Sequence, residues 1–182
     1  MELSLSRKVL IGILVICLGL AIVGTTIFLK KKDQGERDVA TSIFTSNEAF
    51  ATYTDILGNP VALEDYLGQL VVATTWASWS PFSATDLPAL DRLASQYQRE
   101  AVFLAINRKE NREQAARYIE TLPELKNVIV VIDIEDKFYT LTGGYAMPET
   151  VVFDKEGQII VHQRGELRVD EITSLLKTDD SP

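Results

Sequence analysis

The chain has 182 residues, of which 46% are hydrophobic and 24% charged, and this composition excludes a wholly disordered protein. Its formal net charge is −8. Without the five basic residues and the one acid of an amino-terminal apolar run and its flanks, 13 basic and 25 acidic residues give a net charge of −12. Such a charge repels nucleic acid and anionic lipid, so neither is expected to bind the rest of the chain.

The apolar run extends from Val9 to Leu29 without a charged side chain. As a helix that rises about 1.5 Å per residue, it matches a hydrocarbon core of about 30 Å. Three lysines follow it with no small-residue cleavage site, so we expect an uncleaved membrane anchor. Basic residues flank the run on both sides, and the positive-inside rule therefore leaves its orientation open. The sole cysteine, Cys17, lies in this run, so no intramolecular disulfide can form in this sequence.

Beyond the anchor, short β-rich apolar runs alternate with amphipathic stretches, which predicts parallel strands joined by helices in one α/β domain. The segment before them, 50–69, turns at Gly58-Asn59-Pro60 and predicts a short hairpin. The predicted strands are Leu70–Trp76, Ala101–Asn107 and Val128–Asp133; the helices are Pro81–Arg99, Lys109–Leu122 and Asp136–Leu141; a hairpin of Thr150–Asp154 and Gln158–Gln163 and a helix over Val169–Lys177 follow. The expected parts are a flank (1–8), an anchor (9–29), a linker (30–43), a domain (44–178) and a tail (179–182).

One motif directly follows the first predicted buried strand. It is Trp76-Ala77-Ser78-Trp79-Ser80-Pro81-Phe82-Ser83, followed by Leu87-Pro88-Ala89-Leu90. It resembles the membrane-anchored thioredoxin-like proteins of the TlpA/ResA type, in the redoxin/thioredoxin superfamily, which carry W-A-x-W-C-x-x-C and then a helix with a proline. Tyr145-Ala146-Met147-Pro148 and 151–157 resemble the family's cis-proline loop and hairpin. The resemblance covers about 50–176. It implies a thioredoxin fold, a central mixed sheet flanked by helices, with the amino terminus in the cytoplasm and the domain in the periplasm or at the cell surface.

Ser80 and Ser83 stand where that family carries its two redox cysteines. A serine hydroxyl is a far poorer acid than a thiol and forms no S–S bond, so we expect no dithiol chemistry and no catalytic residue here. A structural role is favoured, because Ser80 precedes Pro81 as an N-cap residue would, and Ser83 could bond to the backbone. The alternative is a serine nucleophile, for which His162, the sole histidine, would have to be the base.

The resemblance also implies a binding surface. In thioredoxin-like proteins, the residue before the cis-proline offers its backbone to an extended peptide, a form of strand addition. The candidate residues for a protein or peptide partner are Trp79, Pro81, Phe82, Met147 and Pro148, with a cis bond predicted between the last two. The alternative is that Pro148 only shapes a turn and Trp79 only packs.

No cofactor and no metal site are expected, because the sequence has no histidine–cysteine cluster and no phosphate-binding loop. The acids Asp133, Glu135 and Asp136 are typical of a solvated helix start rather than a cation loop.

Three functions are compatible with these observations. The first is a redox-inactive, membrane-tethered binding module outside the cytoplasm. The second is a thiol–disulfide oxidoreductase or peroxiredoxin-like protein whose cysteines have been lost or substituted, and the third is a structural subunit of a membrane complex.

Overall fold

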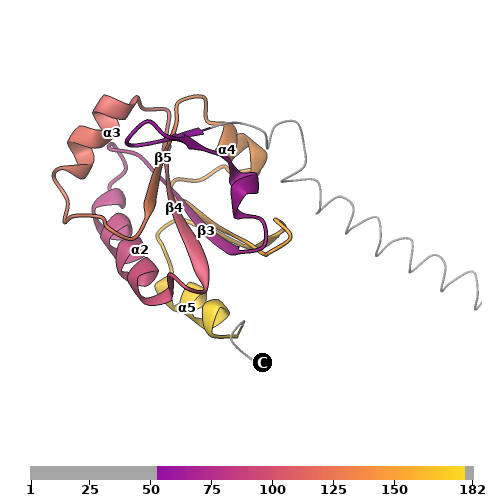
Figure 1. Cartoon of the computed structure of the whole chain (residues 1–182). Coiled ribbons are helices and arrows are strands. Elements are labelled where there is room, and N and C mark those ends of the chain that lie inside the picture. Colours follow the sequence, from indigo (N-terminus) through magenta and orange to yellow (C-terminus); the bar gives the residue numbers. More distant parts are fainter. Residues whose placement is uncertain (1–52, 179–182) are drawn as a thin grey trace, which may run out of the picture. The chain divides into compact units, whose positions relative to one another are not determined.

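The computed structural model describes residues 53–178, in which strands and helices alternate as the sequence predicts (Figure 1). The strands are β1 (Tyr53–Asp55), β2 (Pro60–Val61), β3 (Leu70–Trp76), β4 (Ala101–Arg108), β5 (Ile129–Asp133), β6 (Glu149–Phe153) and β7 (Ile159–Arg164). The helices are η1 (Leu63–Tyr66, a 3₁₀ turn), α2 (Ser83–Tyr97), α3 (Arg112–Ile119), α4 (Lys137–Leu141) and α5 (Val169–Thr178). The bounds of β3 are as predicted, and those of the other elements differ by a few residues at most.

All seven strands form one sheet in the order β2-β1-β5-β4-β3-β6-β7. The three central strands are parallel, with Leu70 opposite Ala101 in β3 and β4, while β6 runs antiparallel to β3 and β7 antiparallel to β6. This confirms the predicted parallel centre and terminal hairpin. The β1–β2 hairpin also forms as predicted, and β1 adds to the edge of β5, with Thr54 opposite Ile132.

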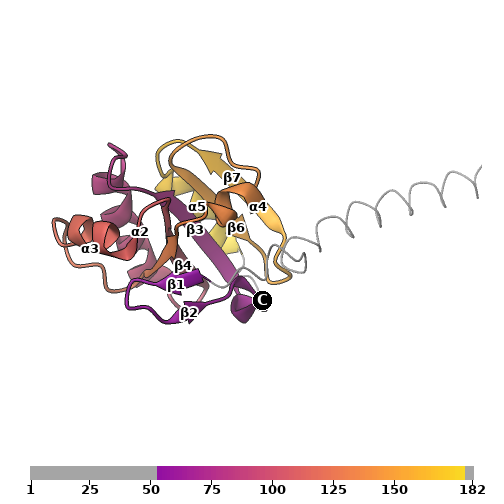
Figure 2. The ribbon, with the colours of Figure 1, turned by 90° about the horizontal axis from the view of Figure 1, so that it is seen from above.

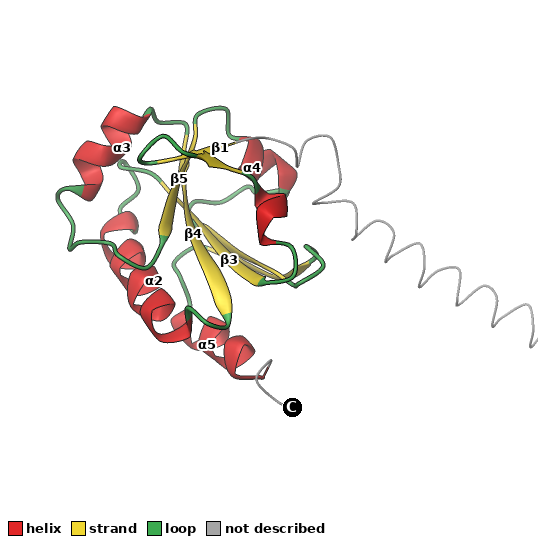
Figure 3. Cartoon of the chain, viewed as in Figure 1, coloured by secondary structure: helices red, strands yellow, loops and turns green. Residues whose placement is uncertain are grey.

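Apolar side chains cover both faces of this sheet, because the central strands are buried on both sides. Helices α2, α3 and α5 pack on one face, and η1 and α4 on the other. Figures 2 and 3 show these two layers of helices from different directions. Leu87 and Leu90 of α2 are fully buried, and each such leucine stabilises the fold by about 2 kcal/mol or more. The chain therefore has the thioredoxin-like α/β architecture.

Within residues 53–178, no helix is both long enough and apolar enough to cross a membrane. The predicted flank, the anchor from Val9 to Leu29, the linker (30–43), the start of the predicted domain (44–52) and the tail (179–182) all lie outside the described residues, so those assignments stay predictions.

Candidate functional site

The loop after β3 carries most of the motif 76–83 and presents apolar side chains to solvent. Trp76, the last residue of β3, is buried and stacks on Tyr118 with the ring centroids 5.7 Å apart. Three residues later, Trp79 is 62% exposed, and Pro81 and Phe82 are exposed as well. Three of the predicted partner-binding residues therefore share one accessible loop.

Ser80, in this loop, and Ser83, directly after it, are both buried. The Ser83 hydroxyl donates to the Ala77 carbonyl at 2.8 Å and accepts from the Ala77 N–H at 3.4 Å, which confirms the predicted backbone bonding. The prediction that the Ser80 side chain caps α2 is wrong. The helix begins only at Ser83, so it is the Ser80 carbonyl that accepts from the Ser83 N–H, at 3.2 Å. The Ser80 Oγ has no hydrogen-bond partner among the described residues.

A buried glutamate, Glu110, fixes the position of the motif loop. Its Oε2 accepts from the Ser78 N–H at 2.9 Å and from Asn107 Nδ2 at 2.7 Å. Its Oε1 accepts from the Ser78 hydroxyl and, at 2.7 Å, from Gln114 Nε2. Hydrogen bonds to a charged acceptor are stronger than neutral ones, so Trp79 projects from a fixed backbone.

The second loop, before β6, contains the predicted proline. The Met147–Pro148 bond is cis, as predicted. Pro148 is buried, and its carbonyl accepts from the Gly165 N–H at 2.8 Å. Met147 is half-buried, with its Sδ 3.7 Å from Arg108 Nη1. Of these two candidate partner-binding residues, only Met147 has an accessible side chain.

Another buried glutamate, Glu149, holds this second loop, and the sequence analysis did not single it out. Its Oε1 accepts from the N–H groups of Tyr145 at 2.9 Å and Ala146 at 2.7 Å, and its Oε2 lies 2.7 Å from His162 Nε2. Burial alone would raise the pKa of Glu149, but these N–H donors together with His162 hold that pKa below its usual value. His162 is thus engaged with Glu149. The only sequence feature that could have indicated this role is the position of Glu149 directly after Pro148.

The two loops meet at one end of the sheet. Thr75 Oγ1 accepts from the Glu149 N–H at 2.8 Å and donates to the Glu149 carbonyl at 3.2 Å. This residue lies one position before Trp76, where β3 leads into the motif loop. The structure therefore places the carboxyl end of β3 beside the amino end of β6, with the two loops adjacent.

A buried ion pair lies beneath Met147. Arg108 donates from Nε and Nη2 to the two carboxylate oxygens of Asp136, each at 2.6 Å, and its Cζ lies 3.4 Å from the Tyr139 ring centroid. Burial would raise the pKa of Asp136, and Arg108 lowers it below its usual value. Asp133 is also buried and accepts from the N–H groups of Lys137 and Phe138 at the start of α4.

The helix start predicted at these acids is thus confirmed. The prediction that the acids are solvated is wrong for Asp133 and Asp136, because both side chains are buried and each carboxylate has partners inside the protein. Glu135 is exposed, as predicted. Among the described residues, no group of three or more His, Cys, Asp or Glu side chains is arranged to hold a metal ion.

The family of the chain follows from its match to a family model. Residues 45–162, more than half of the chain, match the model described as the AhpC/TSA family. The chain belongs to the AhpC/TSA family.

Relatives of this AhpC/TSA protein are thiol–disulfide oxidoreductases. The thiol-disulfide oxidoreductase ResA of Bacillus thuringiensis subsp. konkukian (strain 97-27) is 23% identical over 124 residues, which cover 68% of the chain and 71% of that protein. The thiol:disulfide interchange protein DsbE of Allochromatium vinosum is 29% identical over 98 residues, or 54% of the chain and 52% of that protein.

Solved structures support the same fold. The exposed lipoprotein thioredoxin of Streptococcus pneumoniae strain TIGR4 superimposes with a TM-score of 0.64 at 25% identity, covering 70% of the chain and 97% of that protein. A secreted Mycobacterium tuberculosis disulfide oxidoreductase gives a TM-score of 0.62 at 17% identity, covering 73% and 98% respectively. The AhpC/TSA chain therefore has thioredoxin-fold neighbours and ResA- and DsbE-type relatives.

One further buried acid of the AhpC/TSA chain, Asp86, lies in the first turn of α2. Burial raises the pKa of this carboxyl to about 6, although its Oδ2 accepts from the Leu167 N–H at 3.3 Å. Sequence reasoning missed Asp86, because a carboxylate near a helix start is ordinarily solvated and favourable there.

Proposed function

We propose that this protein is a redox-inactive thioredoxin-like module that binds an extended segment of a protein partner outside the cytoplasm, tethered through Val9 to Leu29. Ser80 and Ser83 stand at the two redox positions in this proposal. Trp79, Pro81, Phe82 and Met147 form the binding surface, and the buried Pro148 shapes the loop that carries Met147. The uncharged amino-terminal run supports the tether, and a structural neighbour described as an exposed lipoprotein supports the extracytoplasmic placement.

The observation that carries the proposal is the state of Ser80, in the loop after β3, and of Ser83, the first residue of α2. Forming a disulfide removes two electrons and two protons from a pair of thiols, and hydroxyl groups cannot replace them. The Ser83 hydroxyl is instead engaged with the Ala77 backbone. The surface next to the serines has kept accessible apolar groups, since Trp79 and Phe82 are exposed on a loop that Glu110 fixes. Exposed, fixed aromatic side chains are typical anchors of interfaces.

A second candidate function is a thiol–disulfide oxidoreductase, favoured by the activity for which the ResA and DsbE relatives are named. It would require a thiol pair, and the single cysteine of this sequence, Cys17, has no second cysteine with which to pair. The two candidates differ in one measurable property, which is reduction of a disulfide substrate.

The experiment compares the purified full-length protein with the Ser80→Cys/Ser83→Cys double variant. The wild-type protein should reduce neither insulin disulfides nor peroxide above the buffer rate. The double variant should form an internal disulfide, seen as the loss of two titratable thiols on oxidation, and should gain insulin reduction. Activity of the wild-type protein would refute redox inactivity. A double variant whose thiols cannot pair would refute the assignment of positions 80 and 83.

A further inference from the structure

Tyr145 and Arg164 form an exposed stack beside the proposed binding surface. The Arg164 Cζ lies 4.3 Å from the Tyr145 ring centroid, within the range of a cation–π contact. Tyr145 is 72% exposed, and the Arg164 side chain is 39% exposed. Neither side chain belongs to the hydrophobic core, and the proposed function has so far given neither of them a role.

The stack is held in place from below. Glu149 accepts hydrogen bonds from the N–H groups of Tyr145 and Ala146, so the tyrosine projects from a fixed loop. Arg164 is the last residue of β7, opposite Glu149 in the antiparallel pair of β6 and β7. The next residue, Gly165, donates its N–H to the Pro148 carbonyl at 2.8 Å. The stack therefore adjoins the Met147–Pro148 segment.

The N–H groups of Arg164 are not saturated by the neighbouring acid. Arg164 forms a long ion pair with Glu149, with its Nε 3.8 Å from the Oε1, but this contact is beyond hydrogen-bond distance. The Glu149 oxygens already accept from Tyr145, Ala146 and His162, so the N–H groups of Arg164 stay available. Within residues 53–178, the Arg164 side chain donates no hydrogen bond. The nearby Arg168 differs, because its Nε pairs with Glu171 at 2.6 Å.

A guanidinium that stacks on a ring uses its planar face and leaves its N–H edge available. That edge matches a carboxylate, which it can bind through two parallel hydrogen bonds. A stacked guanidinium also has few rotamers left to lose, so little ordering cost opposes binding.

We propose that Tyr145 and Arg164 form a carboxylate-binding subsite for the partner segment. This inference rests on the proposed function and gives the partner a chemistry: an extended peptide with a carboxylate next to the part that lies along Met147–Pro148. An aspartate or glutamate side chain and a free C-terminal carboxylate offer the same group, and the experiment separates these sources.

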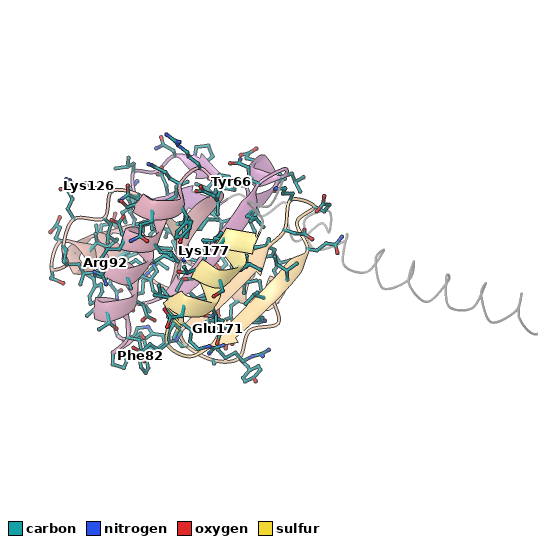
Figure 4. All side chains as sticks on the ribbon, turned by 90° about the horizontal axis from the view of Figure 1, so that it is seen from below. Tyr66, Phe82, Arg92, Lys126, Glu171 and Lys177 are labelled. Atoms are coloured by element: carbon teal, nitrogen blue, oxygen red, sulfur yellow. The ribbon has the colours of Figure 1, made fainter. Side chains whose placement is uncertain are left out.

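The test measures fluorescence anisotropy of dye-labelled peptide pools with the purified full-length protein, using an uncharged dye. All pools are short, acetylated and otherwise free of charged residues. The first has glutamate at one central position and an amidated C-terminus, the second has glutamine there and the same amide, and the third has glutamine and a free C-terminal carboxylate. Arg164→Gln removes the charge, Arg164→Lys keeps the charge but not the planar edge, and Arg92→Gln is the matched control. Figure 4 shows Arg92, on α2, and Phe82, in the loop before α2, at separate places.

The glutamate pool should bind wild type about fivefold to tenfold more tightly than the glutamine pool, as a charge-assisted pair at a partly exposed site gives. Arg164→Gln should remove this preference, Arg164→Lys should retain only part of it, and Arg92→Gln should leave it unchanged. If the third pool alone gains affinity, the carboxylate is that of a chain terminus. Equal affinity for all pools, or a preference that survives Arg164→Gln, would overturn the subsite while the proposed function stands. No binding of any pool would overturn both.

Discussion

Asp86 offers a direct test of how burial changes the charge state of this fold. The change is Asp86→Asn, which removes the charge but keeps an oxygen that can accept from the Leu167 N–H. Because burial raises the pKa of Asp86 from 3.8 to about 6, the ionised carboxylate is unfavourable in the folded protein at neutral pH. The asparagine variant avoids that cost.

The size and sign of the effect follow from the two pKa values. Between about pH 4 and pH 6 the folded state holds the Asp86 proton more tightly than the unfolded state, so this group lowers the free energy of unfolding as pH rises. The shift of roughly two pKa units corresponds to about 3 kcal/mol at most. Because an amide is also desolvated on burial, we expect Asp86→Asn to gain about 2 kcal/mol above pH 6.5 and little or nothing near pH 4.

The assay is urea unfolding of wild type and variant at several pH values, followed by tryptophan fluorescence. Both tryptophans of the chain, Trp76 and Trp79, lie in the described domain, so the signal reports on its unfolding. Other titrating acids contribute equally to both proteins and cancel in the difference. Asp65→Asn, at an exposed position of η1, controls for the change in net charge. If Asp86→Asn is no more stable than wild type at neutral pH, the burial argument is refuted.

Two further predictions concern the binding surface and the topology. Trp79→Ala should weaken binding of the glutamate peptide pool about tenfold or more, because it removes an exposed aromatic anchor. Leu57→Ala, at another exposed apolar position, should leave this binding unchanged. Equal effects of the two substitutions would contradict the proposed surface. Alkaline phosphatase, which needs an oxidising compartment, should be active when fused after Pro182, and an inactive fusion together with an active cytoplasmic reporter at the same point would reverse the proposed orientation.

The sequence was sufficient to predict the strands and the order of the elements. Leu70–Trp76 is an uncharged run rich in β-branched residues, and all of β3 is buried because the strand is covered on both faces. The cis bond before Pro148 was predicted from the resemblance of its loop and not from local propensity. The addition of β1 to β5 was not predicted, since Thr54 and Ile132 meet across a long stretch of chain without any local pattern that pairs them.

The side chains that organise the two loops were missed for a similar physical reason. Glu110 lies on a loop and Glu149 next to a proline, where an acid is ordinarily solvated. Their burial is possible because backbone N–H groups of loops satisfy them. The contacts from Ser78 to Glu110 and from His162 to Glu149 also join residues that are far apart in the sequence. The cap predicted at Ser80 failed because the turn between Ser80 and Ser83 delays the start of α2.

The core of the described domain closes without a cysteine, since the only one in the sequence is Cys17. Many small exported domains depend on disulfides formed by oxidising enzymes after export. Here the two apolar layers on the seven-stranded sheet replace such cross-links, so neither an oxidant nor disulfide shuffling is needed to reach the native state. Folding of the domain therefore does not depend on the redox state of its compartment through a disulfide.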